Sequence, residues 1–163
     1  MNTKTKIVKL KKLKGIVSRL RKEGKTIAFT NGCFDILHYG HISYLEKAKQ
    51  KNRIIIIGLN SDSSVRILKG SRRPIVPERQ RAAVLAALAC VDYVTIFNED
   101  TPLKLIQALI PDVLVKGADW KGKEVVGARI VKENGGRVEF IQYLPRWSTT
   151  NIIKTIAKKC ASY

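Results

Sequence analysis

Short apolar runs rich in β-branched residues alternate along this chain with longer segments whose apolar positions recur every three or four residues. The short runs have the length and composition of strands, and the longer segments have the period of helices. The predicted strands are Thr26–Thr30, Arg53–Asn60, Tyr93–Phe97, Asp112–Lys116 and Arg137–Ile141. The predicted helices are Gly40–Gln50, Pro77–Ala89, Thr101–Leu109, Glu124–Asn134 and Thr149–Lys158.

This alternation predicts an α/β fold, a doubly wound (Rossmann-like) parallel sheet of about five strands with helices on both faces, in a single domain. Thr101-Pro102 has the residue types of a helix start, and Asn134-Gly135-Gly136 those of a helix end. In sheets of this kind ligands bind beyond the carboxyl ends of the strands, where the strand order reverses. Residues that follow the strands are therefore the first candidates for function.

A basic amphipathic helix is predicted before the first strand. Residues 1–25 hold ten Lys and Arg against Glu23 alone, which is half of the chain's formal net charge of +18. The apolar positions of this segment form one helical stripe, made of Leu10, Leu13, Ile16, Val17 and Leu20. We therefore expect a basic N-terminal helical extension over residues 1–25 and, over residues 26–163, the domain that contains the sheet.

The basic face of this helix has three interpretations. It could be a solvated surface, it could bind nucleic acid or an anionic membrane, or it could attract small polyanionic substrates. The segment has no aromatic residue that could stack on bases and no known nucleic-acid motif, so nucleic acid is disfavoured.

The composition narrows the class of protein further. A chain of 163 residues with 45% hydrophobic residues is an ordinary folded domain, which excludes intrinsic disorder. Its longest apolar run, Ile54 to Leu59, is far shorter than the roughly 18 residues of a membrane span. Met1–Leu10 does not resemble a secretory signal, and the three cysteines show neither metal-site nor disulfide spacing. We expect a soluble cytoplasmic protein with reduced thiols and no bound structural metal.

The run from Thr30 to His41, directly after the first strand, carries both histidines of the chain. Gly32 permits a tight turn beside a ligand, and free N–H groups at the start of the next helix can bind phosphate. His38 and His41 are three residues apart, so both side chains project from one side of the first helical turn and can donate to phosphate oxygens. A metal site lacks a third ligand here, while a packing pair of histidines is the structural alternative.

Two further segments carry groups suited to anions. Lys69, Arg72 and Arg73 are predicted to lie in a loop beyond the second strand, where mobile cations could receive a sugar phosphate or simply remain solvated. Ser148–Thr150 opens the last predicted helix, where hydroxyls and unpaired N–H groups could hold a phosphate or serve as an ordinary N-cap.

These motifs resemble those of the nucleotidyltransferase superfamily that contains the cytidylyltransferases and adenylyltransferases. The His-x-Gly-His motif of residues 38–41 alone indicates the superfamily. Over residues 26–158 the chain is similar to the D-glycero-β-D-manno-heptose 1-phosphate adenylyltransferase family, which forms ADP-heptose for lipopolysaccharide. The further matching segments are Asn60-Ser61-Asp62, residues 69–74 with Pro77, Arg81, Val91-Asp92, residues 114–120 and residues 148–154.

The resemblance implies that the adenylyl group of ATP is transferred to heptose 1-phosphate with release of pyrophosphate, and that Mg²⁺ is bound by ATP rather than by the protein. It implies His38, His41, Lys69 and Arg81 as catalytic residues. It also implies nucleotide binding by Thr30, Asn31, Gly32, Phe34, Asp35, His38, Gly40, His41, Arg81, Lys116, Gly117, Asp119, Ser148, Thr149 and Thr150. A separate sugar kinase would supply the acceptor, and a homodimer is compatible with the sequence.

Two alternatives stay open at the level of sequence. A cytidylyltransferase for glycerol 3-phosphate or a related polyol phosphate shares the main motif, and such enzymes carry Asp-Trp where this chain has Asp119-Trp120. The second alternative is a nucleic-acid-binding module without catalysis, in which the positive net charge would bind the phosphate backbone. Because no Ser-His-Asp or Cys-His arrangement is visible, an enzymatic reaction is predicted to be a direct transfer without a covalent intermediate.

Overall fold

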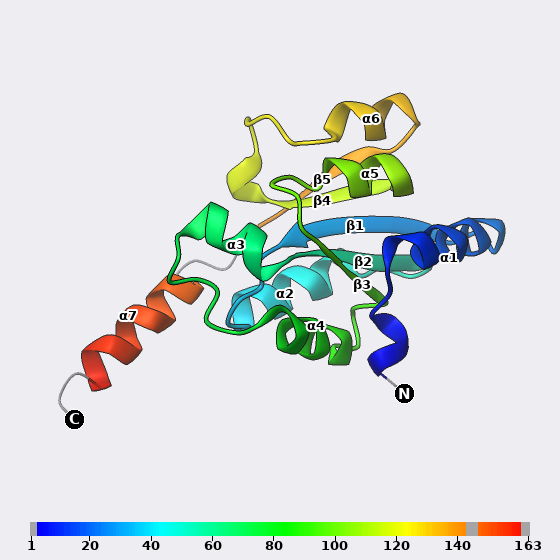
Figure 1. Cartoon of the computed structure of the whole chain (residues 1–163). Coiled ribbons are helices and arrows are strands. Elements are labelled where there is room, and N and C mark those ends of the chain that lie inside the picture. Colours follow the sequence, from blue (N-terminus) through cyan, green and yellow to red (C-terminus); the bar gives the residue numbers. More distant parts are fainter. Residues whose placement is uncertain (1–2, 143–146, 161–163) are drawn as a thin grey trace.

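Five parallel strands form one sheet in the computed structural model, which describes residues 3–142 and 147–160 (Figure 1). The strands are β1 (Thr26–Gly32), β2 (Arg53–Asn60), β3 (Tyr93–Phe97), β4 (Val113–Gly117) and β5 (Arg137–Ile141). Their order across the sheet is β3-β2-β1-β4-β5. The chain therefore builds outward from β1 to β3 and then returns to the other side of β1. The predicted doubly wound sheet is confirmed, and its order reverses between β1 and β4.

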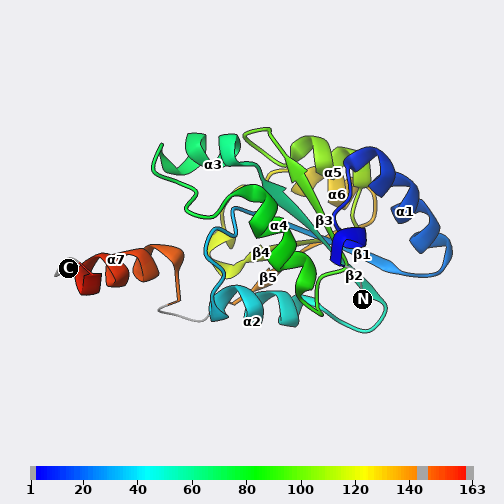
Figure 2. The same cartoon turned by 60° about the horizontal axis from the view of Figure 1, so that its bottom comes forward.

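Helices cover both faces of this sheet (Figure 1). One face carries α1 (Leu10–Lys22), α5 (Leu103–Leu109) and α6 (Ala128–Glu133), and the other carries α2 (Tyr39–Ala48) and α4 (Glu78–Ala87). Beyond the carboxyl ends of the strands lie α3 (Asp62–Lys69) and α7 (Thr149–Cys160), and α7 extends away from the sheet (Figure 2). None of the described helices is long and apolar enough to cross a membrane.

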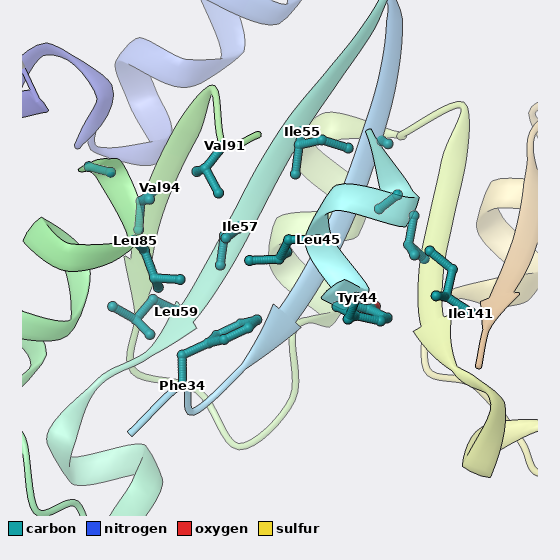
Figure 3. Close-up of a cluster of buried hydrophobic side chains, with 14 of the residues drawn as sticks. Phe34, Tyr44, Leu45, Ile55, Ile57, Leu59, Leu85, Val91, Val94 and Ile141 are labelled. Carbon is teal, nitrogen blue, oxygen red and sulfur yellow. The ribbon is translucent and has the colours of Figure 1, made fainter. Parts of the chain in front are cut away.

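The core is split by the sheet into two layers. Strand side chains alternate in direction, so β2 sends Ile55, Ile57 and Leu59 to the side of α2 and α4 and sends Ile56 to the opposite side. Figure 3 shows the first of these layers, in which Leu45 of α2 points toward the β2 side chains. Packing on both faces explains why the strands are apolar over nearly their whole length.

The basic opening segment shares this core. Leu13, Val17 and Leu20 are buried against the sheet, which confirms the predicted apolar stripe. Before α1, a short 3-10 turn over Thr3–Lys6 places the Lys6 Nζ where it donates to the carbonyls of Leu88, at 3.1 Å, and Val91, at 2.7 Å. Within the described residues, the boundary predicted at residue 25 therefore falls between two segments that pack together.

The prediction that Lys69 lies in a loop beyond β2 is wrong, because the chain forms α3 there and Lys69 is its last residue. Ser61 is the N-cap and its Oγ accepts from the Ser64 backbone N at 3.2 Å. Gly70, at a φ of 92°, ends the helix. Both residue types are typical helix boundaries, so the signal was present in the sequence. Arg72 does lie in the connection after the helix, as predicted.

Two other helices begin two or more residues later than predicted. Pro102 occupies the N-cap of α5, so that helix begins at Leu103 rather than at Thr101. Gly127 is the N-cap of α6 with a φ of 80°, and a Cβ on it would lie 2.7 Å from Ile106 Cδ1. This backbone turn excludes a helix that begins at Glu124. Conversely, β1 runs two residues further than predicted and carries Asn31 and Gly32 to the edge of the sheet.

Candidate active site

A cavity of about 390 Å³ opens at the carboxyl ends of β1 and β4, where the strand order reverses. Many of the residues that the sequence predicts for the site line this cavity. They come from β1, the connection to α2, α2 itself, the end of α3, β4 and the start of α7, and are Thr30, Asn31, Gly32, Phe34, Asp35, His41, Lys69, Lys116, Gly117, Thr149 and Thr150.

Other predicted site residues do not line the cavity, namely His38, Gly40, Arg81, Asp119 and Ser148. His38 and Gly40 adjoin His41, and Ser148 directly precedes Thr149. Asp119 lies in the 3-10 turn Ala118–Trp120 that follows β4. Their assignment to substrate binding stays a prediction.

His38 and His41 stack on each other at the start of α2. Their ring centroids are 3.8 Å apart and their planes differ by 24°. His38 is the N-cap of α2, and its carbonyl accepts from the His41 backbone N at 2.9 Å. The helix start therefore fixes the spacing of the two rings, although His38 lies just before the first helical turn rather than within it.

Burial favours the uncharged form of both imidazoles. Desolvation lowers the pKa of His38, and desolvation together with the nearby His38 lowers the pKa of His41 to about 4. The Nδ1 atoms of both rings are buried and have no hydrogen-bond partner among the described residues. A buried polar atom without a partner costs free energy, so the pair is suited to gaining hydrogen bonds when a ligand binds.

The glycine between these histidines lets two segments approach closely. A Cβ on Gly40 would lie 3.0 Å from the His38 ring and 3.0 Å from the Trp147 Cβ. Trp147 also contacts Tyr39 edge to face, with ring centroids 5.7 Å apart. Gly40 therefore allows the residue before Ser148 to pack on the histidine motif, which holds the start of α7 beside the cavity.

Lys116 brings a buried cation to the cavity wall. Its side chain comes from β4, and the residue is 8% exposed. Burial lowers its pKa to about 8, while Asp119 acts in the opposite direction. The Nζ donates to Asn31 Oδ1 at 2.5 Å and lies 5.3 Å from the centroid of the Trp120 ring. Such an ammonium favours an anionic ligand, because an anion would offset its desolvation.

Asp35 connects the histidine motif to the loop after α3. Its side chain is 1% exposed, and Oδ2 accepts from Arg73 Nε at 2.6 Å. Oδ1 accepts from the backbone N atoms of Ile75 and Val76, both at 2.8 Å. The carboxylate is therefore committed to holding the segment 73–76 over the cavity.

Arg81 connects four segments of the chain near the cavity. Its guanidinium is fully buried and donates to the carbonyls of Cys33, Asn60 and Val76, and to Asp62 Oδ1 at 2.7 Å. These acceptors belong to the β1–α2 connection, the end of β2, the loop before α4 and the start of α3. The structure thus uses donors of Arg81 inside the protein, and direct contact of Arg81 with a nucleotide phosphate stays a prediction.

The start of α7 brings two threonines to the cavity. Thr149 Oγ1 donates to the Ile36 carbonyl at 3.3 Å, which ties α7 to the segment before the histidines. Ser148 Oγ accepts from the Asn151 backbone N at 3.1 Å, as an ordinary N-cap does. Thr149 and Thr150 line the cavity, so the N-terminus of the helix faces the space where an anion would lie.

Sequence reasoning left several lining residues without a role, namely Cys33, Tyr44, Asn60, Leu68 and Trp120, whereas Arg73, predicted as a cation for a sugar phosphate, lines the cavity. Tyr44 had a signal, because it follows His41 by three residues and so shares a helix face with it. Its hydroxyl lies 2.8 Å from Thr30 Oγ1. Cys33 is half-buried, and burial raises the pKa of its thiol.

The donor set of the cavity suits phosphate better than a bare metal ion. Among the described residues, no group of three or more His, Cys, Asp or Glu could hold a metal ion. Asp35, the carboxylate on the cavity wall, is occupied by Arg73 and the backbone. The other polar side chains of the wall include lysines, an arginine, amides, hydroxyls and the His41 imidazole.

A parallel sheet with such groups at its switch point is typical of nucleotide-binding proteins. The chain belongs to the cytidylyltransferase-like family, whose model matches residues 29–155.

Comparison with known proteins supports this membership. The chain is 54% identical over 153 residues to the bifunctional protein HldE of Geobacter metallireducens, covering 94% of this chain and 31% of that protein. It is 52% identical over 158 residues to the HldE protein of Helicobacter pylori, covering 97% of this chain and 33% of that one. The chain thus spans about a third of the length of these curated relatives.

A solved structure shares the fold. The lipopolysaccharide core biosynthesis protein from Thermoplasma volcanium GSS1 superposes with a TM-score of 0.59 and 28% sequence identity. The match covers 73% of this chain and 96% of that protein.

Proposed function

We propose that this chain is an adenylyltransferase that transfers the adenylyl group of ATP to D-glycero-β-D-manno-heptose 1-phosphate, giving ADP-heptose and pyrophosphate for lipopolysaccharide precursor synthesis. The observation that carries the proposal is one cavity in which His41, Lys69, Lys116 and the Thr149–Thr150 turn face the same space. The relatives named HldE and the structural neighbour named for lipopolysaccharide core biosynthesis support the choice of a sugar phosphate acceptor.

The proposed chemistry is one in-line displacement at phosphorus. A phosphate oxygen of the sugar 1-phosphate attacks the α-phosphorus of ATP and forms the new P–O bond. The bond from the α-phosphorus to the bridging oxygen breaks, and pyrophosphate leaves with the electron pair. The residues of the cavity stabilise the growing negative charge and hold two polyanions together against their mutual repulsion.

Each group has a distinct part in this proposal. His41 and the Thr150 hydroxyl donate to oxygens of the triphosphate, because neutral imidazole and hydroxyl donors strengthen as charge develops. His38 orients His41 by stacking on it. Lys69 and Lys116 supply positive charge where the two phosphates meet. Arg81 and Asp35 position the surrounding segments rather than contact the reacting atoms.

Mg²⁺ enters the proposal as part of the nucleotide substrate. The cavity offers no carboxylate cluster among its described residues, whereas triphosphate oxygens and water are sufficient ligands for this ion. Bound there, Mg²⁺ would neutralise part of the charge on ATP.

A sugar kinase that phosphorylates the anomeric hydroxyl of the sugar would supply the acceptor, so we place one upstream. The use of ATP and the free state of Cys33, Cys90 and Cys160 support a cytoplasmic reaction.

Pyrophosphate release from a panel of substrate pairs tests the proposal. We expect release with ATP and D-glycero-β-D-manno-heptose 1-phosphate, and at least tenfold slower release with CTP and glycerol 3-phosphate. The reverse preference would replace the proposal with a polyol phosphate cytidylyltransferase. Salt-sensitive binding of RNA or DNA without release from any pair would replace it with a nucleic-acid-binding module.

A further inference from the structure

A second cavity, of about 340 Å³, adjoins the first. The two cavities share part of their walls, so they meet along one boundary. The shared residues are Asn31, Asn60, Leu68, Lys69, Lys116 and Trp120. A ligand in either cavity can therefore reach both lysines.

The walls that are not shared differ in chemistry. The first cavity alone has His41 and the Thr149–Thr150 turn. The second alone has Asp100, Thr101 and Pro102, from the connection between β3 and α5, and Val126. One cavity thus presents additional donors to anions, whereas the other presents a carboxylate, a hydroxyl and apolar side chains.

The second cavity is therefore positively charged on one side and negatively charged on the other. Lys69 and Lys116 are on its shared side, and Asp100 is on the side that belongs to it alone. A phosphate is attracted to the lysines and repelled by the carboxylate, while a sugar hydroxyl can donate to the carboxylate. Pro102 and Val126 can cover the C–H surface of a ring. A phosphorylated sugar fits this polarity in one orientation.

We propose that the second cavity is the sugar subsite of the enzyme and that Asp100 selects the acceptor by accepting a hydrogen bond from a sugar hydroxyl. Lys69 and Lys116 then hold the sugar phosphate at the boundary, next to the α-phosphate of ATP in the first cavity. The inference rests on the proposed function, since it assigns the two cavities to its two substrates.

The Asp100 carboxylate is accessible to a sugar hydroxyl. Asp100 is exposed, and no ion pair or hydrogen bond of its carboxylate is formed within residues 3–142 and 147–160. Its neighbour Glu99 forms an ion pair with Lys104 at 3.1 Å and does not line the cavity. The two adjacent acidic residues therefore form a matched pair for experiment, because each substitution removes one negative charge from the same connection.

The test compares Asp100→Ala with Glu99→Ala in steady-state kinetics. Asp100→Ala should raise the KM for heptose 1-phosphate by about 10- to 100-fold, the size of losing one hydrogen bond to a charged group, and leave the KM for ATP within about twofold. Glu99→Ala should leave both KM values within about twofold. Inorganic phosphate, which can reach the lysines but not Asp100, should inhibit all three proteins at similar concentrations.

An unchanged KM for heptose 1-phosphate in Asp100→Ala, or an equal rise in the KM for ATP, would overturn the inference while the transferase activity of the unsubstituted protein stands. Calorimetric titration with heptose 1-phosphate separates the remaining cases. If the unsubstituted protein binds the sugar phosphate without releasing pyrophosphate, and Asp100→Ala abolishes binding, the subsite stands and the proposed function fails. If the unsubstituted protein neither binds nor turns over, both fail.

Discussion

The His41 imidazole has a pKa of about 4, mainly because it is desolvated. In the unfolded chain the pKa of the same imidazole is near 6.5. Between these values the unfolded state binds a proton that the folded state does not. The free energy of unfolding should therefore fall as the pH drops from about 6.5 to about 4, by at most ~1.4 kcal/mol per pH unit from this group.

Urea unfolding at several pH values measures this effect. His41→Asn should show a smaller loss of stability over the same range than the unsubstituted protein, because Asn does not titrate. Equal pH dependence in both proteins would show that His41 is not held neutral by the fold.

The Lys116 ammonium, with a pKa of about 8, is charged at pH 7 and loses its proton well below the usual range for lysine. Binding of inorganic phosphate should therefore weaken as the pH rises through about 8. Lys116→Arg should remove this step, because arginine keeps its charge throughout. Inhibition constants for phosphate between pH 7 and 9.5 measure it, and an identical decline in both proteins would contradict a role for this charge.

At the level of single residues, the sequence predicted much of the cavity wall but not the partners of some charged side chains. The histidine spacing, Gly32 and the threonines at the start of α7 could be found because helix starts and strand ends have local signals. Asp35 and Arg81 form internal ion pairs with Arg73 and Asp62, which lie 38 and 19 residues away in the sequence. Such pairings depend on tertiary structure and leave no local pattern.

At the level of elements, the segment after α3 is held over the cavity by one carboxylate. Asp35→Asn removes the charge that pairs with Arg73 and places an amide where backbone N–H groups of Ile75 and Val76 need an acceptor. We expect faster tryptic cleavage after the exposed Arg72, and a higher KM for ATP.

Limited proteolysis followed by mass spectrometry measures the cleavage rate. Glu133→Gln, which alters an exposed ion pair with Arg129, is the matched control and should cleave at the unsubstituted rate. Unchanged cleavage in Asp35→Asn would mean that the segment is held by other contacts.

The elements that the sequence missed or misplaced share a cause. Strands were predictable because both faces of the sheet are buried and the strands are therefore apolar. The helix α3 has boundary signals at Ser61 and Gly70, but only Ser64 and Val65 within it are buried, so its apolar period is weak. The late start of α6 depends on the close approach of Gly127 to Ile106, a tertiary contact.

At the scale of the whole molecule, α1 is bound to the same core as the sheet. Leu13→Ala removes a fully buried side chain and should lower the free energy of unfolding by about 2–5 kcal/mol. The exposed neighbour Lys14→Ala should change it by less than about 0.5 kcal/mol. Chemical denaturation measures both.

A single transition shifted in Leu13→Ala is the expected result, because α1 and the sheet share one layer of the core. A separate early transition, with the remaining unfolding unchanged, would show that residues 1–25 fold independently of the sheet.

The most direct test of the central claim is the rate of pyrophosphate release from ATP and heptose 1-phosphate by the unsubstituted protein and by His41→Ala, measured side by side. The proposed role of His41 as a donor to the transition state predicts a rate lower by about 100- to 1000-fold in His41→Ala, with both proteins folded by circular dichroism. Equal rates in the two proteins would contradict the proposal that this cavity carries out the transfer.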